Sequence, residues 1–129
     1  MIVTLFLAAG APVDMPDWNC DNPVAQQEMT GCAPQESNRG DAALNQQWKL
    51  TATAMKAQDA EWDFSQDRRP GHFDTLLAAQ RAWLTYRDNH CASEGYWARG
   101  GSMEPLLVST CKTTLTERRT EQLRSLIEQ

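Results

Sequence analysis

Residues 76–91 read Leu76-Leu77-Ala78-Ala79-Gln80-Arg81-Ala82-Trp83-Leu84-Thr85-Tyr86-Arg87-Asp88-Asn89-His90-Cys91, and this stretch decides the fold class. Seven of its side chains recur at intervals of three and four residues, which is the spacing of one face of an α-helix. They are Leu76, Leu77, Gln80, Trp83, Leu84, Arg87 and Cys91. Because no alternating strand pattern appears in the chain, we expect a long helix here.

Two further stretches show helical spacing, one before and one after this helix. From Asp41 onward, the residues near one face are Leu44, Trp48, Thr51, Met55 and Trp62. After Ser102, which can cap a last helix, the inner face comprises Leu106, Leu107, Cys111, Leu115, Arg118, Gln122, Leu123 and Leu126. The sequence therefore predicts an all-α fold, a small bundle of three main helices stapled by disulfides.

Glycine and proline mark the expected breaks between helices. Pro70-Gly71 lies in a loop expected between Phe64 and Phe73, after which Asp74 can cap the middle helix, and Gly100-Gly101 precedes the last one. A short extra helix could begin at Pro23, with Asn22 as its N-cap, and run to about Thr30. We expect it to be separated from the first main helix by Gly31, Pro34 and Gly40.

Length and charge limit the classes of function. A chain of 129 residues fits one domain. The net charge of −5 argues against nucleic acid, which binds clustered basic surfaces. It serves either solubility alone or attraction to a basic protein partner. We expect residues 1–11 to be the remnant of a signal peptide, 12–19 a linker and 20–129 the helical domain.

The amino-terminal segment suggests export. Residues 2–11 are apolar and then small, like the hydrophobic part of a secretory signal with its cleavage region near Ala8 to Ala11, although no Lys or Arg precedes them. The run is too short to span a bilayer, which takes about 20 apolar residues. An even number of cysteines in a small chain also suggests an oxidising compartment. We therefore expect a periplasmic or secreted protein without a membrane span.

The four cysteines form an early and a late pair. Cys91 and Cys111 lie at similar distances on either side of Gly100-Gly101, so an antiparallel hairpin would bring them together. Elimination then pairs Cys20 with Cys32. A helix between these two would hold their Cα atoms roughly 15 Å apart, whereas a disulfide needs about 4.4–6.8 Å. The segment must fold back, or the early cysteines pair with the late ones, and the sequence leaves these connectivities open.

Metal, cofactor and catalytic sites find little support. No Cys-x-x-Cys pair suggests zinc or haem. His72 and His90 fall in no triad or metal spacing, and no glycine-rich phosphate loop is present. We expect no metal, no cofactor and no enzymatic activity.

Several arginines are expected to form ion pairs or hydrogen bonds, and several aromatic side chains are expected to be buried. Arg87 and Arg118 lie close to apolar stripes and are expected to find carboxylate or backbone partners, because an unpaired buried charge is costly. Asp41 and Asp88 are the acids available for this. Three tryptophans are expected in the core: Trp48, Trp62 and Trp83. The turn residues Tyr96 and Trp97 are expected to pack against the end of the hairpin, with an exposed recognition patch as the alternative.

The chain resembles the LprI-like lysozyme-inhibitor family over about residues 20 to 127. The stretch 76–91 resembles its signature, Cys20 to Cys32 its opening cysteine segment, and 41–48 an element in which Trp48 stands where Tyr is usual. The resemblance extends to the closing part, around Gly100-Gly101-Ser102, Cys111, Arg118 or Arg119, and Leu123.

This resemblance implies an exported, helical, disulfide-bonded bacterial protein, and the family name implies inhibition of lysozyme. We expect it to bind lysozyme or another basic envelope protein, either by occluding the lysozyme cleft or, alternatively, as an envelope interaction or immunity-type module for a different protein. It implies structural roles for Gln80, Arg81, Trp83, Tyr86, Arg87 and Asp88, of which Trp83, Tyr86 and Arg87 are expected in the core. We expect the partner-binding surface to be either a loop with Asp67, Arg68, Arg69 and His72 or the turn with Tyr96 and Trp97.

Overall fold

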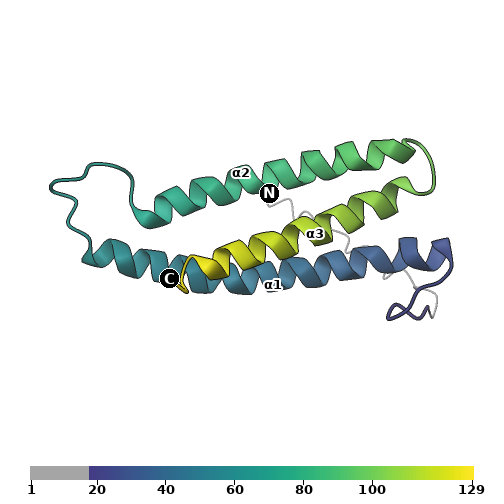
Figure 1. Ribbon diagram of the computed structural model, residues 1–129, viewed down its shortest axis with the longest axis horizontal. Coiled ribbons are helices and arrows are strands. Elements are labelled where there is room, and N and C mark those ends of the chain that lie inside the picture. The colour runs from purple at the N-terminus through teal and green to yellow at the C-terminus, as the bar shows by residue number, and fades with distance from the viewer. Residues whose placement is uncertain (1–17) are drawn as a thin grey trace, which may run out of the picture.

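The computed structural model describes residues 18–129, and they form a three-helix bundle. The helices are α1 (Gln26–Glu61), α2 (His72–Gly95) and α3 (Glu104–Ser125), with a short 3-10 helix, η1 (Tyr96–Ala98), between the last two. The chain runs along the long axis in α1, back in α2 and forward again in α3 (Figure 1). The predicted all-α architecture is confirmed, whereas the proposed signal segment 1–11 and most of the linker lie outside the described residues.

α1 is one continuous helix, so the predicted short extra helix and the break after it are wrong. The helix begins after Ala25, not after Asn22, and continues through Pro34 and Gly40. Pro34 removes one backbone hydrogen bond, but most of a helix's stability in a protein comes from packing of its inner face. α1 packs against both other helices, and this packing overrides the two weak helix formers.

Two predicted helix caps also differ from the structure. α2 begins at His72 behind Gly71, so Asp74 already lies in its first turn and caps nothing. α3 begins at Glu104 behind Met103. The Ser102 hydroxyl instead accepts a hydrogen bond from Gln26 Nε2 at 2.9 Å, which ties the start of α1 to the start of α3.

The disulfides are Cys20–Cys32 and Cys91–Cys111, each with a Cα–Cα distance of 5.4 Å. The second joins α2 to α3 across the hairpin, as predicted. The first forms because residues 20–25 are not helical and the chain folds back along the first turns of α1. The steric conflict therefore disappears, and the local pairing is confirmed.

The apolar core is small and has polar neighbours. Its buried members are Leu44, Met55, Leu76 and Leu123, against which Trp48, Phe73 and Trp83 pack. Trp62 does not join them: it follows α1 directly and is 50% exposed. The buried Thr51 hydroxyl donates to the Leu123 carbonyl at 2.9 Å, so even the centre of the α1–α3 interface contains a polar contact.

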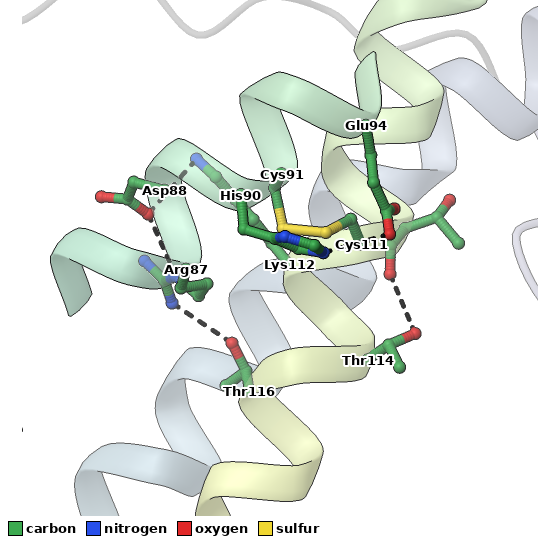
Figure 2. The surroundings of a disulfide bond; sticks show 10 residues. Arg87, Asp88, His90, Cys91, Glu94, Cys111, Lys112, Thr114 and Thr116 are labelled. Atoms are coloured by element: carbon green, nitrogen blue, oxygen red, sulfur yellow. Dashed lines mark hydrogen bonds and ion pairs between the residues drawn. A yellow bond between two sulfur atoms is a disulfide. The ribbon is translucent and has the colours of Figure 1, made fainter. Parts of the chain in front are cut away.

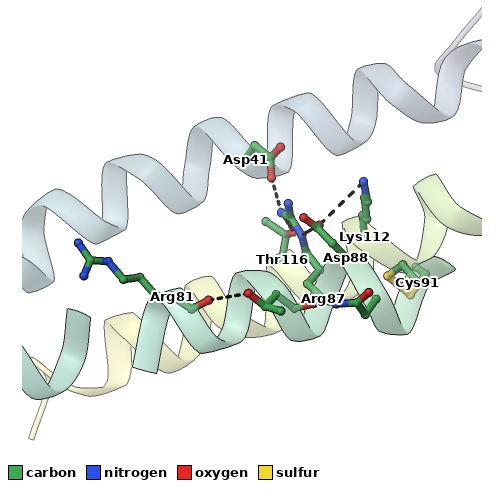
Figure 3. A network of polar contacts seen from close by, with 10 residues as sticks. Asp41, Arg81, Arg87, Asp88, Cys91, Lys112 and Thr116 are labelled. Atoms are coloured by element: carbon green, nitrogen blue, oxygen red, sulfur yellow. Dashed lines mark hydrogen bonds and ion pairs between the residues drawn. A yellow bond between two sulfur atoms is a disulfide. The ribbon is translucent and has the colours of Figure 1, made fainter. Parts of the chain in front are cut away.

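Arg87 joins the three helices through a second polar cluster (Figure 3). Its Nη1 donates to Asp41 on α1 at 2.9 Å and to the Thr116 hydroxyl on α3 at 3.2 Å, and its Nε donates to Asp88 at 3.1 Å. The predicted pairing of Arg87 with these two acids is confirmed. Arg118 is different, because it is exposed and makes no ion pair with the described residues.

None of the helices between residues 18 and 129 combines the length and the apolar character that crossing a membrane requires.

Candidate functional site

The residues expected to bind a partner lie at opposite ends of the bundle. Asp67, Arg68 and Arg69 lie in the connection between α1 and α2, residues 62–71, which we call the α1–α2 loop. Tyr96 and Trp97 form η1 in the connection between α2 and α3, residues 96–103, which we call the α2–α3 turn. Figure 1 shows the α1–α2 loop extending beyond the helices at the end away from the turn. One compact partner site therefore cannot include both groups.

Aspartates fix the shape of the α1–α2 loop. Asp67 accepts hydrogen bonds from the Arg69 backbone N–H at 3.1 Å and from its guanidinium at 2.9 and 2.7 Å. These bonds lower the pKa of Asp67 to about 2 and raise that of Arg69. Asp63 accepts the backbone N–H of Ser65 at 2.9 Å in a similar turn. The loop is thus ordered by its own side chains and leaves Arg68 exposed.

Asp59 on α1 anchors the far end of this loop. Its carboxylate accepts the backbone N–H groups of His72 at 2.6 Å and Phe73 at 3.0 Å, the first two residues of α2. It also contacts His72 Nδ1 at 2.9 Å. The Phe73 N–H, followed by the contacts with His72, lowers the pKa of Asp59. A side chain from one helix thereby caps the next, an arrangement that the sequence spacing did not reveal.

A cavity of about 720 Å³ lies beneath the α1–α2 loop. It brings together three of the predicted binding residues, Asp67, Arg69 and His72, but not Arg68. Its remaining lining comprises Met55, Trp62, Phe64, Pro70, Gly71, Thr75, Leu76, Ala79, Arg119 and Leu126. Most of this surface is apolar, and its size falls in the usual range for small-ligand sites.

Arg119 is the polar residue on α3 that faces this cavity. Its Nε donates to Gln80 Oε1 at 2.8 Å and its Nη1 to Gln122 Oε1 at 3.1 Å. Its buried Nη2 has no hydrogen-bond partner among residues 18–129, and burial lowers the pKa of the guanidinium. The helical spacing predicted the neighbouring Arg118 for the inner face of α3, but Arg118 is exposed and Arg119, midway between Leu115 and Leu123, occupies that face.

The α2–α3 turn exposes aromatic surface. Trp97 is 91% exposed and Tyr96 53%, so the expectation that they pack against the hairpin is wrong. The Arg99 guanidinium lies 4.4 Å from the centre of the Tyr96 ring and covers part of it. An exposed aromatic pair of this kind is a common component of protein-binding surfaces.

Comparison with known proteins identifies the family of the chain. Residues 20–123 match the family model described as "Lysozyme inhibitor LprI". The chain belongs to the LprI family. It is also 41% identical over 128 residues to an uncharacterized protein of Rhizobium meliloti (strain 1021). This alignment covers 98% of this chain and 92% of that protein. No solved structure matches it.

The signature residues of this LprI protein differ in burial. Gln80 and Arg87 are buried, Trp83 is half-buried and packs on the core, and Arg81 and Asp88 are exposed. Tyr86 was expected in the core, but it is exposed and stacks on the His90 ring with centroids 5.3 Å apart. The signature therefore includes both core and surface positions of α2.

A group of possible metal ligands surrounds the Cys91–Cys111 disulfide (Figure 2). His90 Nε2 lies 3.4 Å from Glu94 Oε1, and the Cys111 sulfur is within 4.8 Å of both side chains. That sulfur is bonded to Cys91, so it is not the thiolate that binds metals. This arrangement carries no argument for a metal site.

Proposed function

We propose that this LprI protein is exported to the bacterial envelope and inhibits lysozyme by occluding its cleft, with no catalysis of its own. The match of residues 20–123 to the inhibitor family carries the proposal. Two disulfides support an oxidising compartment, such as the periplasm. The geometry offers ordered surfaces at its two ends, which suits a protein that acts by binding.

The α1–α2 loop is the better candidate for entering the cleft. Lysozyme hydrolyses its substrate with two carboxyl groups that flank the sugar bond. A protruding loop that carries a free cation can approach these groups, and Arg68 is exposed and makes no ion pair with the described residues. Arg69, beside it, already has Asp67 as its partner. Because the loop is ordered in advance, it loses little conformational entropy on binding.

Charge supports the approach of the two proteins. With a net charge of −5, the inhibitor is attracted to a basic enzyme, whereas the local cation at Arg68 is directed to the acidic residues of the cleft. Long-range attraction of this kind increases the association rate and is screened by salt.

An inhibition assay tests the proposal directly. Purified protein with intact disulfides is titrated into c-type lysozyme acting on bacterial cell walls, and affinity is measured by calorimetry over a salt series. We expect saturable inhibition that weakens as salt rises. Full lysozyme activity at a large molar excess of the protein would refute the proposed function.

Matched variants then locate the surface. Arg68→Ala should weaken inhibition at least about tenfold, as loss of an interface anchor does. Arg81→Ala, which removes another exposed arginine from the middle of α2, should leave inhibition unchanged. If Arg68→Ala inhibits like the wild type, the α1–α2 loop does not enter the cleft.

The exposed turn favours a second candidate, an envelope interaction module that binds a different protein. Trp97 at 91% exposure is the observation behind it. Trp97→Ala should leave lysozyme inhibition intact if the loop binds the enzyme. If the wild type does not inhibit lysozyme but captures another envelope protein and Trp97→Ala does not, the second candidate replaces the first.

Export has its own measurement. Mass spectrometry of protein recovered from the periplasm, without reduction, should show a chain four hydrogens lighter than the fully reduced form and shortened near Ala8 to Ala11. A reduced, full-length chain confined to the cytoplasm would contradict this part of the proposal.

A further inference from the structure

The cavity beneath the α1–α2 loop exists because the three helices end at different levels. α3 ends at Ser125, while α1 and the loop continue beyond it (Figure 1). The last turns of α1 and the first turns of α2 thus face each other without a third helix between them. Met55, Leu76 and Leu126 contribute apolar surface to the resulting space.

The cations around this space differ in one respect. Arg69 is paired with the Asp67 carboxylate at 2.7 Å, and His72 contacts the Asp59 carboxylate at 2.9 Å. Arg119 has only neutral amides as partners, Gln80 and Gln122. Among the described residues that line the cavity, Arg119 is therefore the cation whose charge no carboxylate balances.

A cation without a counter-ion beside an apolar cavity is complementary to a ligand that has both an anionic group and an apolar chain. We propose that the cavity binds a small single-chain amphiphile, with its apolar chain between α1 and α2 and its carboxylate on the Arg119 guanidinium. Arginine and carboxylate form charge-assisted hydrogen bonds, which are stronger than bonds to neutral amides. The Gln122 side chain is exposed, so its contact with Nη1 is readily exchanged for the ligand.

The apolar part of the ligand accounts for the rest of the lining. Trp62 and Phe64 expose large ring surfaces to the cavity rim, and burying them against a hydrocarbon chain removes apolar area from water. The volume of about 720 Å³ suits a compact ligand of this class. This binding activity is separate from lysozyme inhibition and does not depend on it.

Calorimetry with decanoate, below its micellar concentration, tests the proposal on the full disulfide-bonded chain. We expect one binding site per molecule. Arg119→Gln should weaken decanoate binding about tenfold or more, because it removes the charged donor. Arg118→Gln, which removes the exposed neighbouring arginine of α3, should bind like the wild type.

Two further measurements separate charge from shape. Uncharged 1-decanol should bind the wild type more weakly than decanoate does. Its affinity for Arg119→Gln should equal its affinity for the wild type, because it has no charge for Arg119 to pair with. Ala79→Phe places a ring in the cavity and should abolish the binding of both ligands, while circular dichroism confirms a folded helical chain. Absence of saturable decanoate binding, or equal decanoate affinity of Arg119→Gln and Arg118→Gln, would overturn the proposal.

Discussion

Asp59 shows how one side chain can connect two helices and a loop. Its lowered pKa means that it contributes stability above its ordinary pKa of 3.8, and that this contribution is lost as the pH falls through the lower, folded-state value. Asp59→Ala should therefore lower the melting temperature at pH 7, and the deficit should shrink at pH 2. Thermal unfolding followed by circular dichroism measures both. Glu117→Ala, at an exposed position of α3, should cause no such deficit.

Arg87 provides a second prediction at this scale. Replacing it with Met keeps much of its length but removes its hydrogen bonds to Asp41 and Thr116. The Asp41 side chain is 43% exposed and can turn to water, so we expect a moderate loss of about 1–3 kcal/mol in the free energy of unfolding. Urea denaturation measures it. Arg81→Met on the exposed face should change it little, and equal losses in both variants would show that the polar cluster is unimportant.

At the residue scale, the sequence correctly predicted the interaction of a charged side chain that is buried and must pair with an opposite charge. Arg87 on an apolar stripe required an acid, and Asp41 and Asp88 were available. Prediction from the sequence failed for Asp59, whose capping of α2 depends on how the intervening loop folds. It failed also for Trp62 and Trp97, because the helical spacing of an aromatic residue does not show whether another element covers it.

Among the helices, α1 departs most from its sequence pattern. Pro34 and Gly40 are weak helix formers, and the sequence pattern predicts a break there. The unfavourable helix propensities of these two residues are outweighed by the stabilisation that a long helix gains from packing against two others. Helix type and approximate position were therefore predictable for all three elements, but the continuity of α1 required knowledge of its neighbours.

Two helical glycines should respond in opposite directions to the same change. A Cβ at Gly40 would lie 3.6 Å from Thr116 Cγ2, an ordinary contact, so Gly40→Ala should stabilise the protein by about 0.5–1 kcal/mol. A Cβ at Gly95 would approach Val108 Cγ2 to 2.6 Å, so Gly95→Ala should push α2 and α3 apart and destabilise it. Urea denaturation of both variants tests the helix spacing, and a stabilised Gly95→Ala would contradict it.

For the whole molecule, the disulfides differ in what they hold. Cys91–Cys111 joins two helices with both residues buried, whereas Cys20–Cys32 ties a short non-helical segment to α1. Replacing Cys91 and Cys111 with Ala should lower the free energy of unfolding by about 3 kcal/mol or more, from lost chain restraint and lost packing. The corresponding change at Cys20 and Cys32 should cost less. Denaturation of the two double variants measures the difference, and the reverse order would contradict this account.

The bundle and its cysteine pairing could be anticipated at this scale, because hairpin symmetry brings Cys91 and Cys111 together. The cavity could not. Its existence depends on how far each helix extends past the others, and helix ends are the least regular part of a sequence pattern. The sequence pattern accordingly places Arg118 on the inner face of the last helix, whereas in the structure Arg118 is exposed and Arg119 faces the cavity.

Both covalent cross-links lie at the end of the bundle where α1 begins and α2 turns into α3, as does the contact of Gln26 with Ser102. The other end is held by Asp59 and by noncovalent packing alone. The two ends of the bundle are thus held by different kinds of interaction, covalent cross-links at one and hydrogen bonds and packing around the α1–α2 loop at the other. Local opening of the bundle should therefore begin in the packing around the cavity, while the cross-linked end stays closed and the α1–α2 loop keeps the turn that Asp67 holds.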